Sequence, residues 1–118
     1  MALTSAMEDY LEAVFMLQKQ NGYVRCVDVA KQLRVKKPSV SRAVKELSRS
    51  DHLVKNADGT LSLTETGLQL AEQIYEKHRF FTERLIAAGV DPITAEQDAC
   101  EIEHAISAES FQKLKKAF

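Results

Sequence analysis

A β-hairpin signal interrupts an otherwise helical sequence near the middle of the chain. Two short apolar stretches, residues 52–54 and 61–63, flank the sequence NADG, in which Asp58-Gly59 favours a tight hairpin turn. Three segments with helical periodicity precede this hairpin, and the second of them is short. A helix, a short helix, a turn, a third helix and a hairpin follow one another in a winged helix-turn-helix. We therefore predict a mainly α-helical protein with a two-stranded wing.

Local signals mark the ends of the expected helices. We expect helices over residues 4–20, 24–35 and 36–51 before the hairpin, with Thr4 or Ser5 as the cap of the first. Three further helices are expected after the hairpin, and their boundaries are marked by Thr64, Gly89, Pro92 and Ser107.

Charge divides the chain near the same place. Residues 31–55 carry eight Lys/Arg and two Asp/Glu, a net charge of +6, whereas the remaining residues carry a net charge of −7. A basic block within an acidic chain indicates a polyanion-binding face on one part only. We therefore expect a winged helix-turn-helix DNA-binding domain at residues 1–63 and a helical domain at residues 64–118.

The third expected helix is the candidate for entry into the major groove, and the hairpin is the candidate for contact with the phosphate backbone. Hydroxyl and basic side chains at the start and along one face of this helix have the chemistry to reach phosphates and base edges. The alternative is a solvated helix face with no partner, since runs of charge are commonly no more than that. The predicted partner is double-stranded DNA, and the predicted contact residues are Lys36, Lys37, Pro38, Ser39, Ser41, Arg42 and Lys45.

Composition limits the remaining possibilities. The chain has 118 residues, 45% of them hydrophobic and 28% charged, which suits one compact helix-rich domain or a small domain with an extension. No apolar run reaches the roughly 18 residues of a membrane span, and the N-terminus lacks the pattern of a signal peptide. We therefore expect a cytoplasmic protein that does not enter a membrane, with Cys26 and Cys100 as free thiols.

Residues 99–107 hold a candidate metal site. Cys100, Glu103 and His104 stand at i, i+3 and i+4, so a helix would place a thiol, a carboxylate and an imidazole on one face. By itself this spacing is a weak signal, because a single histidine on a helix is more commonly structural. Asp9 and Glu12 are a second i, i+3 pair, for which interaction with the helix dipole is the alternative.

Five motifs together make the signal specific. They are MEDYLEAVFML near the N-terminus, VDVAKQLRVKKPSVSRAVKEL, LTETG after the hairpin, KHR, and DACEIEHAIS. In this order and spacing the sequence resembles the diphtheria toxin repressor and manganese transport regulator family across essentially its whole length. The resemblance implies a metal-dependent transcriptional repressor that is not an enzyme. It also implies a winged helix followed by a helical dimerisation domain, with Fe²⁺ or Mn²⁺ bound between them, and control of metal-ion homeostasis genes.

The ligand set that the resemblance implies is a hybrid of two branches of the family. Asp9 and Glu12 match the manganese branch, whereas Cys100 matches the iron branch. Glu96 stands where the iron branch has an ancillary histidine and is a possible additional ligand. Because a thiolate favours softer metals than carboxylates do, we expect Fe²⁺ slightly over Mn²⁺, with Zn²⁺, Co²⁺ or Ni²⁺ able to substitute in vitro. The implied ligands are Asp9, Glu12, His78, Cys100, Glu103 and His104.

The last two expected helices are the candidate dimer interface. Their recurring apolar residues form either this homodimer surface or an intramolecular core, and they are Ile93, Ala99, Ile102, Ile106, Phe111, Leu114 and Phe118. One rival function is a winged-helix regulator that senses an oxidant or an organic ligand, with Cys100 as a redox switch. A metallohydrolase with Glu12 or Glu103 as general base is a second rival. A protein that only buffers metal is a third rival. The basic block at residues 31–55 argues against both the hydrolase and the metal-buffering protein, because neither has a use for it.

Overall fold

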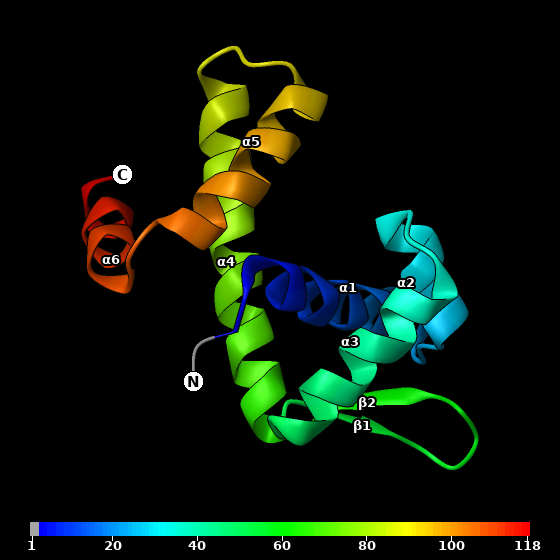
Figure 1. Cartoon of the computed structure of the whole chain (residues 1–118). Helices are drawn as coiled ribbons and strands as arrows, with labels where there is room; N and C mark the ends of the chain where they lie inside the picture. The colour runs from blue at the N-terminus through cyan, green and yellow to red at the C-terminus, as the bar shows by residue number, and fades with distance from the viewer. Residues whose placement is uncertain (1–2) are drawn as a thin grey trace. The chain divides into compact units, whose positions relative to one another are not determined.

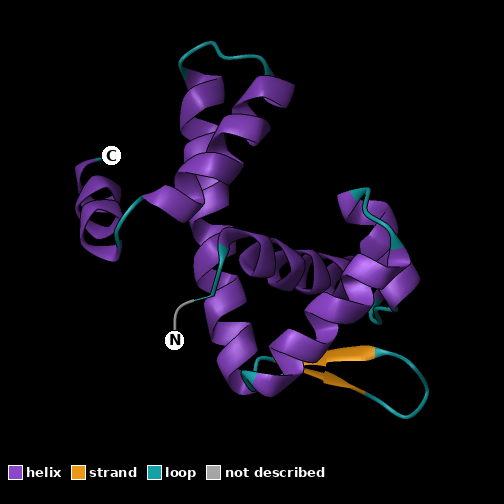
Figure 2. Cartoon of the chain, viewed as in Figure 1, coloured by secondary structure: helices purple, strands orange, loops and turns teal. Residues whose placement is uncertain are grey.

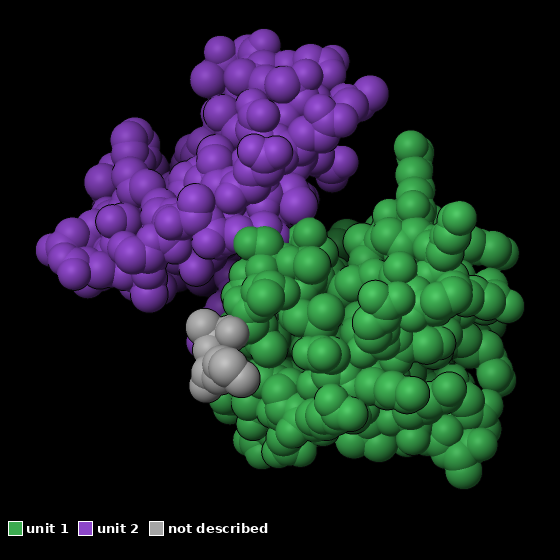
Figure 3. Space-filling model, in the orientation of Figure 1, with its two compact units in different colours: residues 1–72 green, residues 73–118 purple. Residues whose placement is uncertain are grey.

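The structure is a computed structural model that describes residues 3–118. Helices and one two-stranded sheet make up these residues, which confirms the predicted mainly helical fold with a wing (Figures 1 and 2). The packing divides the chain into two compact units, residues 1–72 and residues 73–118 (Figure 3). In chain order the elements are α1 Ser5–Asn21, α2 Cys26–Leu33, α3 Lys37–Arg49, β1 Leu53–Lys55, β2 Leu61–Leu63, α4 Glu65–Ala87, α5 Pro92–Ala105 and α6 Ala108–Ala117.

Side-chain caps begin three of the helices as predicted. The Oγ1 atom of Thr4 accepts a hydrogen bond from the amide of Met7 (3.2 Å), and Ser107 Oγ accepts one from the amide of Ser110 (3.1 Å). Thr64 Oγ1 accepts a hydrogen bond from the amide of Gly67 (3.0 Å) at the start of α4. Each cap satisfies a backbone donor that has no partner within the helix. Local sequence signals were therefore sufficient to place these boundaries.

Unit 1 has a continuous apolar core. α2 packs against α1 and α3, and α3 packs against β1. Valine and leucine at helical spacing supply the buried side chains, because one face of each helix is apolar. The largest fully buried ones in this unit are Leu11, Val14, Val24, Val29, Val40, Leu47 and Leu53. This core holds α3 with its apolar side inward and its polar side facing solvent.

The wing is a short antiparallel hairpin. Leu53 pairs with Leu63 and Lys55 pairs with Leu61. The backbone of Asn56 donates to the carbonyl of Thr60 (2.8 Å), and the turn closes through Gly59 at φ +88°, a conformation that glycine adopts at no steric cost. The predicted Asp58-Gly59 turn is confirmed.

Unit 2 contains the second part of α4 with α5 and α6. Phe111 of α6 packs against Phe80 and Phe81 of α4, with ring centroids 5.5 and 6.0 Å away. The Arg84 side chain donates a hydrogen bond to the backbone carbonyl of Phe118 (2.9 Å), and Lys115 pairs with Glu76 (3.1 Å). α6 is thus held to α4 by an aromatic contact and by polar contacts on its flanks.

The apolar residues predicted for the dimer interface fall into different classes. Ala99 and Phe111 are buried, whereas 69% of Ile93 and 72% of Phe118 are exposed. Part of the predicted stripe is therefore intramolecular core, and part of it faces outward. Both cysteines are free thiols, as expected. Among the described residues, none of the helices combines the length and apolarity that crossing a membrane requires.

Candidate metal centre and DNA-binding surface

A buried polar contact in unit 2 joins α4 to α5. His78 Nδ1 lies 2.8 Å from Glu103 Oε1, and the side chain of Glu103 is fully buried. Burial removes water from a carboxylate, which costs free energy unless a partner or a cation compensates. The sequence resemblance paired these two residues as metal ligands, and they do lie in contact across 25 positions of sequence.

The second carboxylate oxygen of Glu103 has an unusual environment. Glu103 Oε2 is buried and accepts no hydrogen bond within the described part of the chain. Buried polar atoms in folded proteins nearly always have a partner, so such an oxygen needs an explanation. A carboxylate oxygen beside an imidazole fits the donor set that Fe²⁺ or Mn²⁺ uses.

A thiol and an imidazole form a second donor pair on α5. The helix sets Cys100 and His104 one turn apart, and their ligand atoms lie within 4.8 Å of each other. Both residues are half-buried. Because sulfur and nitrogen donors suit transition metals rather than Mg²⁺ or Ca²⁺, this pair narrows the class of ion that the unit could hold.

The two remaining predicted ligands lie on α1 in unit 1. Asp9 is half-buried and Glu12 is only 7% exposed. The acidic residue in the first turn of α1 is Glu8, so Asp9 and Glu12 come after the region where the helix dipole stabilises a negative charge. The dipole explanation considered for this pair therefore does not fit their positions.

Glu96, the possible additional ligand, is exposed on α5. Among the described residues it belongs neither to the pair of His78 and Glu103 nor to the pair of Cys100 and His104. Its role as a ligand stays a prediction. The buried Oγ1 of Thr82 on α4 has no hydrogen-bond partner in the described chain.

α3 presents its polar side to solvent, as the DNA-binding prediction requires. Val40, Val44 and Leu47 are buried on the inner side of the helix. Six of the predicted contact residues are exposed and one, Ser39, is half-buried. The exposed set consists of Lys36, Lys37, Pro38, Ser41, Arg42 and Lys45. Their role as DNA contacts stays a prediction.

Arg25 supports the wing and was not predicted from the sequence. Its guanidinium donates to the backbone carbonyl of Asp58 (3.1 Å), and its backbone forms an isolated bridge with Thr60. The Thr60 side chain and amide donate to the Asp58 carboxylate and lower the pKa of that group. No periodicity signals such a contact, because Arg25 lies 33 residues before Asp58.

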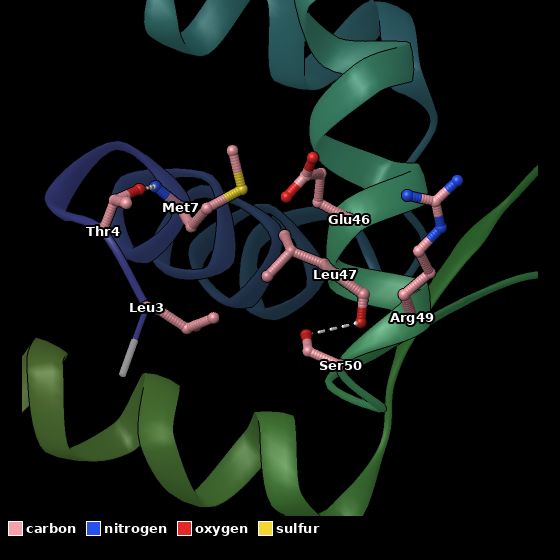
Figure 4. Close-up of a pocket in the computed structure, with 7 residues that line it drawn as sticks. All are labelled: Leu3, Thr4, Met7, Glu46, Leu47, Arg49 and Ser50. Carbon is pink, nitrogen blue, oxygen red and sulfur yellow. Dashed lines mark hydrogen bonds between the residues drawn. The ribbon is translucent and has the colours of Figure 1, made fainter. Parts of the chain in front are cut away.

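A cavity of about 500 Å³ lies between the start of α1 and the end of α3 (Figure 4). Leu3, Met7 and Leu47 give it apolar walls, and Glu46 and Arg49 lie at its polar side. None of its lining residues is a predicted metal ligand or DNA contact. The cavity is therefore not part of either candidate site.

Two family models match the chain. The model described as iron dependent repressor, N-terminal DNA binding domain, matches residues 2–60. The model described as iron dependent repressor, metal binding and dimerisation domain, matches residues 64–118. Together they account for nearly every residue of the chain.

Individual proteins match over the same length. The HTH-type transcriptional regulator MntR of Shouchella clausii is 34% identical over 111 residues, which are 94% of this chain and 78% of that protein. An uncharacterized HTH-type transcriptional regulator of Methanocaldococcus jannaschii is 32% identical over 96% of this chain and 92% of its own length. The crystal structure of T. acidophilum IdeR superposes with a TM-score of 0.80 at 28% identity; the match covers 100% of this chain and 55% of IdeR. This chain therefore spans about half the length of that solved structure.

Proposed function

We propose a function from a premise that the matches establish: the chain belongs to the iron-dependent repressor family, which includes the diphtheria toxin repressor and the manganese transport regulators. The family consists of DNA-binding transcription regulators and not of enzymes. In this chain we propose a cytoplasmic, homodimeric repressor that binds operator DNA when Fe²⁺ or Mn²⁺ is bound. Its proposed targets are genes of metal-ion homeostasis.

The observation that supports metal sensing is the environment of Glu103. A fully buried carboxylate contacts His78 through one oxygen, and its other oxygen lacks a partner among the described residues. A divalent ion would supply the missing positive charge and a common centre for the donors. The residues proposed to hold it are Asp9, Glu12, His78, Cys100, Glu103 and His104.

The donor types favour Fe²⁺ slightly over Mn²⁺. Asp9, Glu12 and Glu103 supply hard oxygen donors, which suit Mn²⁺. Cys100 supplies a thiolate, which shifts preference toward Fe²⁺, and Zn²⁺, Co²⁺ or Ni²⁺ bind such sets in vitro. A thiol must lose its proton to bind, so metal affinity rises with pH while that proton is being released.

The proposed coupling between metal and DNA is thermodynamic linkage. Asp9 and Glu12 belong to the helix that supports the DNA-binding core, and the other four donors belong to α4 and α5. A dimer that reads one operator presents its two recognition helices about 34 Å apart, or a multiple of that distance. A metal that binds the DNA-competent arrangement more tightly shifts the population toward it.

The test is a titration of DNA binding against metal. Anisotropy of a fluorescent duplex carrying the protein's own promoter is measured at physiological salt, with Fe²⁺ under anaerobic conditions, with Mn²⁺, with Zn²⁺ and with chelator. We expect affinity to rise by about tenfold or more with metal, within the usual range of coupling between two sites. Equal affinity with metal and with chelator would overturn metal gating and favour a sensor of an oxidant or organic ligand.

Substitutions assign the effect to the predicted ligands. Glu103→Ala and His104→Ala should each abolish the metal response and leave a folded dimer. Glu101→Ala is the matched control, because Glu101 is exposed on the same helix. An unchanged metal response in both ligand variants would refute the assignment of this site.

Cys100→Glu tests the choice of metal. Replacing the thiol by a carboxylate gives an all-oxygen and nitrogen donor set, so the preference should shift from Fe²⁺ toward Mn²⁺. The order of activation by the two metals in the same titration measures this shift. If the wild type and the variant rank the metals identically, Cys100 does not set selectivity.

A further inference from the structure

The first turn of α4 sits directly on the turn that joins α3 to the wing. The hydroxyl of Thr64 donates to the backbone carbonyl of Asp51 (2.6 Å), and the Thr64 amide donates to the carbonyl of His52 (3.2 Å). Thr64 therefore caps α4 and at the same time ties it to this turn. Asp51 is held at φ +64°, a left-handed conformation that Asp tolerates better than most residues do.

Gly67 makes the second part of this contact. A Cβ atom on Gly67 would overlap the backbone carbonyl of His52, so only glycine lets the helix approach so closely. Gly67 lies within α4 and does not need the left-handed freedom of glycine. Because alanine is the better helix former, the close approach is the physical reason for glycine at this position.

From this contact we infer that Thr64 and Gly67 are positioning residues for DNA recognition. They seat the helix that carries His78 against the junction between α3 and the wing. The contact is largely backbone against backbone, so it leaves little room for side chains to adjust. The inference rests on the proposed function, since it assigns these residues to the coupling between metal occupancy and DNA affinity.

The geometry of α4 makes the coupling direct. Gly67 and His78 stand eleven positions apart on one continuous helix. A regular helix without a break transmits a displacement of one end to the other. The contacts of Thr64 and Gly67 with Asp51 and His52 therefore fix the first turn of α4 to the DNA-binding elements.

The experiment uses Gly67→Ala in the full chain, with Gln69→Ala as the matched control because Gln69 is exposed in the same part of α4. Metal affinity is measured by calorimetry, and DNA affinity by anisotropy with metal and with chelator. We expect Gly67→Ala still to bind Mn²⁺ but to lose most of the metal stimulation of DNA binding, about tenfold or more. The control should retain both.

A second pair of variants tests the inference even if Gly67→Ala fails to fold. Thr64→Val keeps the shape but removes the hydroxyl, and with it both the hydrogen bond to Asp51 and the cap on the Gly67 amide, whereas Thr64→Ser keeps the hydroxyl. We expect Thr64→Val to weaken metal stimulation and Thr64→Ser to restore it; a purely structural role would change stability without changing the stimulation ratio. If both Gly67→Ala and Thr64→Val retain wild-type stimulation, the inference is overturned while the proposed function stands. A wild type that shows no stimulation overturns both.

Discussion

The two units of the molecule differ in what fills their interiors. Unit 1 buries a large set of mainly aliphatic side chains from three helices and a hairpin, together with one carboxylate, that of Glu12. Unit 2 buries far fewer apolar side chains, two of them alanines, and it also buries one carboxylate, that of Glu103. Apolar burial stabilises a fold at about 25 cal/mol per Å², whereas a buried carboxylate opposes it unless compensated. The apolar core of unit 1 therefore compensates more of the cost of its buried carboxylate than the smaller core of unit 2 does, and we propose that a bound cation compensates the rest in unit 2.

This difference matches the division of labour in the family. A DNA-reading element needs a fixed shape, and a rigid aliphatic core supplies it. A metal sensor must change its state when the metal binds. A metal-binding domain that is only weakly stable without metal gains the most stability from that binding. A partner subunit would stabilise unit 2 in the same way. Ile93 and Phe118 are exposed in one subunit, and their burial on dimerisation would add to its buried apolar area.

The largest effect should come from truncation in the core of unit 1. Leu47 is only 1% exposed, so Leu47→Ala should lower the free energy of unfolding by about 2–5 kcal/mol in urea denaturation. Ile86→Ala in unit 2 is the comparison. It should cost less than about 1 kcal/mol, because 43% of Ile86 is exposed. Equal losses would contradict burial as the source of the stability that Leu47 contributes.

Metal should stabilise unit 2 selectively. At a free concentration about 100 times its Kd, a ligand that binds only the folded state adds about 2.7 kcal/mol. Hydrogen exchange should therefore slow at amides of α5 more than at amides of α2, on addition of Mn²⁺ to the apo protein. Glu103→Ala should remove the difference. Protection that is equal in α2 and α5 would contradict a site built on unit 2 donors.

A charge at the exposed start of α5 should weaken the dimer without unfolding the subunit. Ile93→Asp adds a carboxylate in the first turn, where the helix dipole favours it, so helicity should be unchanged. Burying an unpaired charge in an apolar interface costs about 1 kcal/mol or more, which is a weakening of roughly fivefold or greater in the dimer Kd by sedimentation. Gln97→Asp is the control. A dimer as tight as the wild type would place the interface elsewhere.

The smallest effect should appear at the wing. Hydrogen bonds from Thr60 lower the pKa of Asp58, so the charged carboxylate stabilises the folded turn. That contribution is present above the unfolded pKa of about 3.9 and is lost as pH falls through the lower folded value. The chemical shift of the Thr60 amide should titrate with a midpoint below 3.8, the ordinary value of the group. In Asp58→Asn this titration should vanish; its persistence would assign the shift to another group.

Local features of the fold could be read from the sequence, and contacts between distant residues could not. Thr4, Thr64 and Ser107 cap helices through atoms three residues away, so short sequence windows contain the whole signal. The pairing of His78 with Glu103 came only from the family resemblance, because periodicity carries no information across two helices. The wing support from Arg25 was missed for the same reason.

The boundary between the units shows a similar limit. The predicted division after residue 63 follows the change from hairpin to helix, and it stays a prediction. The packing groups residues 65–72 of α4 with the elements before them. The contact of Gly67 with His52 explains this grouping, since it binds the first turn of α4 to the base of the wing. In the sequence, Gly67 is an isolated glycine within a helical segment, which indicates a packing constraint but does not identify the residue that it contacts.

The boundary between the two units falls inside α4 and not at a loop. The number of residues in α4 therefore sets the direction in which its later side chains point relative to its earlier ones. Each residue of an α-helix turns the chain by about 100° and advances it by about 1.5 Å. One residue inserted between positions 70 and 74 would rotate every later side chain of α4, His78 included, relative to the earlier ones. A loop of the same length would absorb that change. A change in the number of residues in this stretch should therefore disturb the molecule more than a change in their identity.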